Sequence, residues 1–596
     1  MTAEYLLPAQ RNEQAALRAE GFVTPHRDTT PQCARFLPRT VIPILFLPGI
    51  MGSNLKLSST RQGQLKKGSN VAWRPDAGLE MLALVSASPA ERQLQLDPAQ
   101  TEVDIYDPKG DRTVSGDHRH RNVRLDDSFD SPLLRTDPPA ASTYRTATQK
   151  ARARGWGEVM FSSYGQVLQY LESRLNNTFD AGRLNPAWQD IVGQDPARWG
   201  LHPDHRASQP ALTEDALKRF ATGRWFPVHA IGYNWLASNG RNARGVAGRI
   251  RALMADYVDQ GYACDQVVLV THSMGGLLAR ALIHPELGAM QDQVLGIVHG
   301  VMPAVGAPAA YKRMRTGFED PGILDAPQDS VAAKILGNRG DEVTAVLANA
   351  PGGLELLPSQ AYPGAWLRVI HQGRELAAWP KGGDPYEEIY LMRDKWYSLI
   401  RTEWINPADE ESRGSGGDGI EQVMQSLEGA RSFHRQIRDT YHKNAYAHYG
   451  ADPDRPSFAT VCWEISDKVS SLEGWEDWQI ARDDARGGLL LTHKVPGKGL
   501  AQPLPSVTFQ DLQPDADAPT RSGFVHVSLG PSDGKGDQTV PTQSAEHALH
   551  SGVFRGVFRQ SGYEHQASYM DRHALASTLF GIVRVVLNKE AAPCQA

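Results

Sequence analysis

Serine, histidine and aspartate can together cleave an ester, and this chain places each of them where such chemistry requires it. Ser273 stands within Val267 to Ile283, VVLVTHSMGGLLARALI, between a short apolar run and a segment whose apolar residues have helical spacing. A serine hydroxyl is a poor nucleophile unless a base faces it and backbone N–H groups stabilise the developing charge. A strand, a sharp turn and a helix would expose Ser273 in this way, so we expect it to be a nucleophile; the alternative is a helix N-cap.

The residues around Ser273 follow the G-x-S-x-G pattern of a nucleophile elbow, with one departure. Gly275 would let the turn pass close to the strand, and Gly276 would let the helix begin tight against the sheet. Thr271 stands where the first glycine usually is, and we expect it to be near the upper size limit for a residue packed under the turn.

The acid is expected after the serine in the chain, on a loop that follows a late strand. Asp537, in the sequence GDQTVP, lies on a glycine-flanked turn after an apolar run at 523–529, and we predict that it orients the base. Three other carboxylates compete for this role: Asp533, Asp320 and Asp325.

The base is expected between the last strand and the last helix, and His565 has this position. We expect His547, His550 and His573 to lie on helical surfaces. His272 is adjacent to Ser273 but should point away from it across the turn, so it is not the predicted base.

Two backbone N–H groups should form the oxyanion hole. One would be that of Met274, directly after the nucleophile, and the other should come from the loop PGIMG at 48–52, where two glycines let the amides turn inward. The second donor is Ile50 or Met51, and the sequence does not separate them.

Alternating strands and helices must position these residues. Apolar runs at 41–47, 227–233, 267–270 and 294–302 predict buried strands, and 161–176 and 242–260 predict helices between them. This order indicates an α/β protein with a mostly parallel sheet, the α/β-hydrolase fold. We divide the chain into an N-terminal arm (1–40), a first core part (41–310) with a loop-rich insertion (56–149), an all-helical lid or cap insertion (311–450), and a second core part with the acid and base (451–596). An ordinary helical subdomain at 311–450 is the alternative to a lid.

Composition excludes several other classes. A net charge of −6 over 596 residues gives no indication of a nucleic-acid partner. The four cysteines have no zinc spacing, although a single disulfide stays open, and we expect no metal and no cofactor. Five aspartates could ligate calcium but lack EF-hand spacing, so a solvated insertion is preferred: Asp97, Asp104, Asp107, Asp111 and Asp117. The N-terminal stretch has no basic region followed by an apolar core, and no run approaches about 18 apolar residues, so we expect no signal peptide, no transmembrane segment and cytoplasmic synthesis.

The motifs PILFLPGIMGSNL, VTHSMGG and GDQTVP, in this order, resemble those of lecithin:cholesterol acyltransferase-like and bacterial triacylglycerol lipases. DPYEEIY and GYEHQASY are similar to sequences of the third family of type VI secretion lipase effectors. This resemblance implies Ser273 as nucleophile, Asp537 as acid, His565 as base, and Met274 with Ile50 or Met51 as oxyanion donors. It also implies an antibacterial phospholipase delivered to the periplasm of a rival cell, an adaptor or spike-protein partner, and an immunity protein.

We therefore expect a serine-dependent lipase or phospholipase A that hydrolyses carboxylic esters of membrane lipids. A soluble-ester esterase or an acyltransferase would use the same residues. The alternative from another class is a non-enzymatic interaction protein on a hydrolase scaffold.

Overall fold

The computed structural model describes residues 40–77, 84–107, 120–135, 146–180, 182–318, 336–410, 419–466, 468–469, 471–492 and 523–591. Within the arm expected at 1–40, it assigns only the backbone of short strands: β1 (Ala3–Pro8), β2 (Gln10–Arg11), β3 (Leu17–Arg18) and β4 (Gln32–Leu37). The prediction for the arm therefore falls largely outside the described residues.

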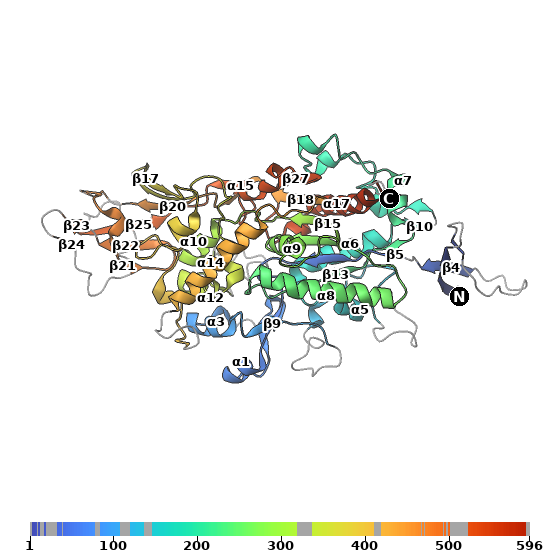
Figure 1. Cartoon of the computed structure of the whole chain (residues 1–596), viewed down its shortest axis with the longest axis horizontal. Coiled ribbons are helices and arrows are strands. Elements are labelled where there is room, and N and C mark those ends of the chain that lie inside the picture. The colour runs from blue at the N-terminus through green and yellow to red at the C-terminus, as the bar shows by residue number, and fades with distance from the viewer. Residues whose placement is uncertain are drawn as a thin grey trace, which may run out of the picture.

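A six-stranded parallel sheet forms the centre of the molecule (Figure 1). Every neighbouring pair in it is parallel. Its order is β13 (Val228–Ala230), β6 (Ile44–Leu47), β14 (Val267–His272), β15 (Val294–Gly300), β18 (Ala445–Gly450) and β27 (Gly556–Gln560). The central strands β6, β14 and β15 are rich in Val, Ile and Leu, because a sheet covered on both faces needs apolar side chains on both. The predicted α/β class is therefore observed.

Helices cover both faces of this sheet. Leu45 and Leu269 belong to a hydrophobic cluster with α8 (Asn239–Asp259) and α9 (Gly275–Ile283). The alternate residues Ile44 and Val268 belong to a second cluster with α6 (Phe161–Asn176) and α17 (Arg572–Ala591). Successive side chains of a strand point to opposite faces, so the two clusters are the two layers of the core.

A second six-stranded sheet lies at the opposite end of the molecule from β10 (Phe179–Asp180) (Figure 1). Its order is β17 (Arg374–Trp379), β16 (Leu367–His371), β20 (Val461–Ile465), β25 (Phe524–Leu529), β22 (Gly488–Thr492) and β21 (Gln479–Asp483). Strand character in the sequence at 458–465, 488–493, 523–529 and 553–560 predicts four further strands that complete the main sheet. For β20, β22 and β25 this prediction is wrong. Of the strands expected after residue 451, only β27 joins the main sheet, because strand periodicity does not specify a strand's partner.

The segment 311–450 is not all-helical. It contains most of α10 (Ala309–Thr316), then α12 (Gly340–Leu347), α13 (Pro351–Leu354) and α14 (Ile420–Ile437), but also the antiparallel pair β16 and β17. The sequence at 384–404 has helical character, but in the structure this stretch forms only single helical turns at Tyr386–Tyr390 and Thr402–Trp404. Its aromatic residues Trp396 and Tyr397 are instead buried against each other, with ring centroids 5.1 Å apart.

The insertion expected at 56–149 contains an antiparallel sheet of β7 (Leu55–Leu57), β8 (Val71–Trp73) and β9 (Thr101–Val103). Asp97 lies 3.2 Å from the Arg61 guanidinium, and Asp104 pairs with Arg74, while Asp111 and Asp117 lie outside the described residues. Its helices are α1 (Ser59–Gln64), α3 (Pro89–Gln95) and α5 (Ala147–Ala153). The described part of the chain has no group of three or more His, Cys, Asp or Glu side chains arranged for a metal ion.

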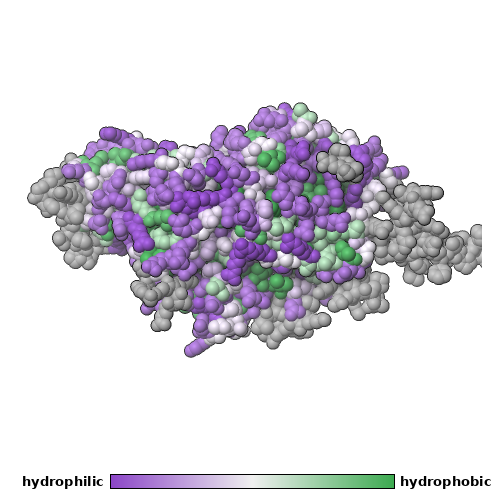
Figure 2. Space-filling view, viewed as in Figure 1, coloured by the Kyte–Doolittle hydropathy of each residue, from purple (hydrophilic) through white to green (hydrophobic). Residues whose placement is uncertain are grey.

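The structure also has three short helices: α7 (Glu214–Ala221), α15 (Thr542–Ala545) and α16 (His547–His550). Short strand pairs are β5 (Thr40–Val41) with β12 (Arg224–Trp225), β10 (Phe179–Asp180) with β11 (Arg183–Leu184), and β19 (Asp452–Ser457) with β26 (Gly534–Gly536). Hydrophilic residues predominate on the face shown in Figure 2, with apolar residues scattered among them. Among the described helices, none is long and apolar enough to cross a bilayer.

Candidate active site

Ser273 occupies a strained turn between β14 and α9. Its φ is 52°, in the left-handed region that non-glycine residues rarely adopt, and its N–H donates to the carbonyl of Gly300 at 2.9 Å. A Cβ on Gly275 would lie 2.5 Å from the carbonyl oxygen of Leu47, so only glycine fits where α9 begins. Strain of this kind persists only where the surrounding structure enforces it, and here it holds the hydroxyl at the end of the buried strand.

Thr271, the departure from the elbow pattern, is fully buried beneath the turn. Its hydroxyl lies 3.2 Å from Nδ1 of His299, and its carbonyl accepts a hydrogen bond from the Tyr569 hydroxyl at 2.9 Å. The larger side chain is therefore accommodated because its polar atom has a partner.

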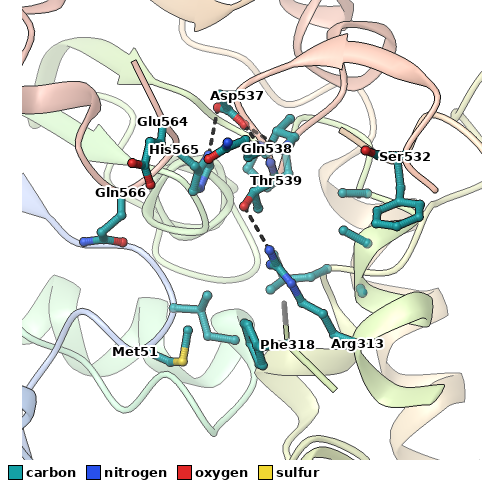
Figure 3. A pocket seen from close by; sticks show the side chains of 18 of the residues that line it. Met51, Arg313, Phe318, Ser532, Asp537, Gln538, Thr539, Glu564, His565 and Gln566 are labelled. Atoms are coloured by element: carbon teal, nitrogen blue, oxygen red, sulfur yellow. Dashed lines mark hydrogen bonds and ion pairs between the residues drawn. The ribbon is translucent and has the colours of Figure 1, made fainter. Parts of the chain in front are cut away.

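His565 lies between Ser273 and Asp537. Its Nε2 is 2.8 Å from Oγ of Ser273, and its Nδ1 is 2.8 Å from Oδ2 of Asp537. Figure 3 shows the second of these contacts at the edge of a cavity. Ser273 is 4% exposed, Asp537 1% and His565 8%, so these hydrogen bonds are shielded from water. This is the geometry of a nucleophile, a base and an orienting carboxylate.

The backbone around Asp537 holds its carboxylate in one orientation. Oδ1 accepts hydrogen bonds from the N–H groups of Val540 at 2.7 Å and Thr539 at 3.2 Å, which leaves Oδ2 facing the imidazole. The carbonyl of Asp537 also accepts from the N–H of His565 at 2.9 Å, so the acid and base loops are joined through their backbones.

Among the competing residues, Asp533 has a different role. Asp533 accepts from the N–H groups of Ala459 and Thr460, both at 2.9 Å, as a loop cap. Asp320 and Asp325 lie outside the described residues. His547 and His550 are on α16, His573 is in the first turn of α17, and the hydroxyl of Tyr441 lies 2.9 Å from Nδ1 of His547.

His272 does not face Ser273, as expected, but it supports the base. Its Nε2 is 2.9 Å from the carbonyl oxygen of His565, and its Nδ1 is 3.1 Å from the hydroxyl of Tyr164. Burial holds the pKa of His272 well below its usual value, so the ring is neutral. Nε2–H therefore donates to His565, and Nδ1 accepts from Tyr164.

Tyr164 connects this chain of hydrogen bonds to the expected oxyanion loop, because its hydroxyl also accepts from the N–H of Gly49 at 3.3 Å. Sequence reasoning missed this residue. It was part of the predicted helix at 161–176, but nothing local indicated that its hydroxyl reaches residues 49 and 272.

The candidate oxyanion donors lie near Ser273. Gly52 N–H donates to the carbonyl of Gly49 at 3.1 Å, which closes a tight turn around Ile50 and Met51, and Met51 has a φ of 61°. Within the described structure, no acceptor bonds the N–H of Ile50, Met51 or Met274. Both Ile50 and Met51 line the cavity, so both stay candidates.

A cavity of about 430 Å³ lies beside His565 and Asp537 (Figure 3). Its wall is largely apolar, with contributions from the oxyanion loop, α10, α12 and the loop before β20: Ile50, Met51, Met160, Pro303, Ala307, Ala309, Ala310, Phe318, Leu347, Leu356, Pro456 and Phe458. Arg313 and Glu564 are charged residues of this wall. The site thus places the hydrogen-bonded serine, histidine and aspartate beside a cavity that has space for an apolar group.

No family model matches the chain, and a search of curated proteins finds no significant match. Among solved structures, the chain is similar to one described as "The crystal structure of Tle4-Tli4 complex", with 28% identity and a TM-score of 0.68. The match covers 92% of this chain and 99% of the other. This likeness supports a Tle-like effector; assignment to one family of such effectors stays a prediction.

Proposed function

We propose that this chain is a serine-dependent lipase with the α/β-hydrolase fold, a phospholipase A that acts as a type VI secretion effector. The observation that carries the proposal is His565, which lies 2.8 Å from Ser273 and 2.8 Å from Asp537 at the edge of an apolar cavity. The likeness to the Tle4-Tli4 complex supports the lipase and effector roles.

The mechanism follows from the hydrogen bonds. His565 Nε2 takes the proton of Ser273 as Oγ attacks the ester carbonyl carbon, and Asp537 stabilises the imidazolium that forms. The N–H of Met274, with that of Ile50 or Met51, stabilises the oxyanion of the tetrahedral intermediate. His565 then gives its proton to the departing alcohol, and the acyl group remains bound to Ser273 as an ester. Water, deprotonated by the same imidazole, attacks this ester, and the fatty acid leaves as Ser273 regains its proton.

The biological setting rests on the likeness to the Tle4-Tli4 complex and on the sequence motifs. The proposal includes an immunity protein that neutralises the enzyme, an adaptor or spike protein that loads it, and delivery to the periplasm of a target cell. It also includes the finer assignment to the third effector family and a lid role for the segment 311–450. No cofactor takes part in the proposed reaction.

The test measures fatty acid released from phospholipid vesicles by the wild type, Ser273→Ala and His565→Ala, together with labelling of Ser273 by a fluorophosphonate. We expect the wild type to be labelled and active, and each variant to lose about 10⁴-fold or more in kcat, as triad losses elsewhere do. A wild type that is neither labelled nor active on any ester would support the interaction-protein alternative. Activity on short soluble esters alone would indicate an esterase.

A further inference from the structure

Arg313 is a charged residue in the wall of the cavity that His565 and Asp537 also line. It is carried by α10, and its guanidinium donates to Oγ1 of Thr539 at 3.0 Å. Thr539 in turn donates its N–H to Asp537, so the arginine is connected to the loop that holds the acid (Figure 3). Among the described residues that line the cavity, Arg313 is the sole lysine or arginine.

The arginine side chain is held in place rather than extended into solvent. Its guanidinium carbon lies 4.6 Å above the ring centroid of Phe318, a cation–π contact, in addition to the bond to Thr539. Both Phe318 and Thr539 line the same cavity. A guanidinium that is already oriented loses less entropy on binding an anion than a free side chain does.

We propose that Arg313 binds the phosphate of a glycerophospholipid, so that the site selects phosphate-bearing lipids over uncharged acylglycerols. This inference rests on the proposed function, because it concerns the substrate of the same triad. In a glycerophospholipid the phosphate is only a few bonds from the acyl ester, so a residue that recognises it must lie close to the triad. Arg313 lines the same cavity as His565, whose Nε2 lies 2.8 Å from Oγ of Ser273, and the apolar wall beside it suits the acyl chain.

Arginine suits this role because its planar fork of N–H donors matches the oxygens of a phosphate, and the bonds are charge-assisted. The largely apolar wall favours them, since charges attract more strongly in less polar surroundings. A diacylglycerol has an uncharged hydroxyl at the corresponding position and gains little from the guanidinium.

The test compares dioctanoylphosphatidylcholine with dioctanoylglycerol, which carry the same ester bonds, in the same nonionic detergent micelles. The quantity measured is the ratio of kcat/KM for the phospholipid to kcat/KM for the acylglycerol, which does not depend on the fraction of active enzyme. For the full-length wild type this ratio should exceed one, and Arg313→Met should lower it by about 10- to 100-fold, the range expected for charge-assisted hydrogen bonds. Arg313→Lys, which keeps the charge but loses the fork, should give an intermediate ratio.

Two controls make the result specific. Arg244→Met, on the exposed surface of α8, should leave the ratio at the wild-type value. Dioctanoylphosphatidylglycerol should respond to Arg313→Met as the phosphatidylcholine does, because both carry the phosphate. A response confined to one of the two would show that the rest of the head group is recognised instead.

The inference and the proposed function fail in different ways. A wild type that hydrolyses both lipids with a ratio of one or below overturns the inference but leaves the serine mechanism intact. An unchanged ratio in Arg313→Met does the same, and if that variant does not fold, the wild-type ratio and Arg313→Lys still decide. A wild type that hydrolyses none of these esters and is not labelled at Ser273 contradicts the proposed function itself.

Discussion

Replacing Asp537 with asparagine should inactivate the enzyme through the tautomer of His565. In the native site Oδ1 of Asp537 accepts hydrogen bonds from two backbone N–H groups. In the variant, the amide oxygen of the asparagine is held at this position by the same donors. Its NH₂ group must then face Nδ1 of His565 and donate to it. Nδ1 becomes the acceptor, the proton moves to Nε2, and Nε2 can no longer accept the proton of Ser273.

The opposite orientation of the amide is unfavourable. It would place NH₂ against the N–H groups of Val540 and Thr539, in a position where residue 537 is 1% exposed. Each backbone donor left unsatisfied there costs about 1–3 kcal/mol, or about 2–6 kcal/mol for the pair. The asparagine is therefore locked in the wrong orientation. We expect a fall of about 10⁴-fold in kcat, the size of loss that follows when a triad histidine is held in the wrong tautomer.

The assay is release of octanoate from dioctanoylphosphatidylcholine micelles, with the rate of fluorophosphonate labelling of Ser273 as a second readout. Asp533→Asn is the matched control, because this aspartate is in the same loop but caps Ala459 and Thr460. Its kcat should stay within about twofold of the wild type. If Asp537→Asn keeps more than a tenth of the wild-type kcat, the tautomer argument is refuted and another group must orient His565.

Further predictions concern the elbow, the supporting hydrogen bonds and a buried acid. Gly275→Ala should lower the free energy of unfolding by about 3 kcal/mol or more in denaturant titrations, since its Cβ would lie 2.5 Å from the Leu47 carbonyl oxygen. The control Gly245→Ala, in open space on α8, should raise this free energy by about 0.8–1 kcal/mol. A similar effect at both sites would contradict the prediction. Tyr164→Phe should cost about 1–3 kcal/mol of stability and lower kcat more than it raises KM, because His272 and Gly49 lose a buried hydrogen-bond partner. The control is Tyr170→Phe. If kcat is the same in both variants as in the wild type, Tyr164 has no role in the active site. Burial raises the pKa of Glu355 from its usual value of about 4.5 to about 8, so the folded state binds the extra proton and stability is lost as pH rises between about 4.5 and 8. Thermal melts of Glu355→Gln should lack this part of the pH dependence, and identical slopes for variant and wild type would show that Glu355 titrates normally.

Local sequence was sufficient where the chemistry depends on neighbours in the chain. The apolar run at 267–270 predicted β14, and 161–176 predicted α6 with the bounds that the structure has. The elbow around Ser273 could be recognised from residues within a few positions of it, because β-branched residues favour the strand and two glycines follow the serine. The reason why only glycine fits at 275 is tertiary, since a Cβ there would lie 2.5 Å from the carbonyl oxygen of Leu47 on another strand. Chain order and turn residues then selected Asp537 and His565, the two side chains that lie in line with Ser273.

The tertiary structure decided what depends on contacts between distant segments. Strands with similar periodicity were divided between two sheets, since alternation determines which face is buried but not which strand is the neighbour. The hydrogen bonds that connect His565 with His272 and Tyr164 also depend on tertiary structure. So does the position of Arg313, because nothing in its helix indicates that its guanidinium reaches Thr539, 226 residues later. A sequence specifies the character of each segment locally, whereas these contacts arise only when the packing of the whole core brings the segments together.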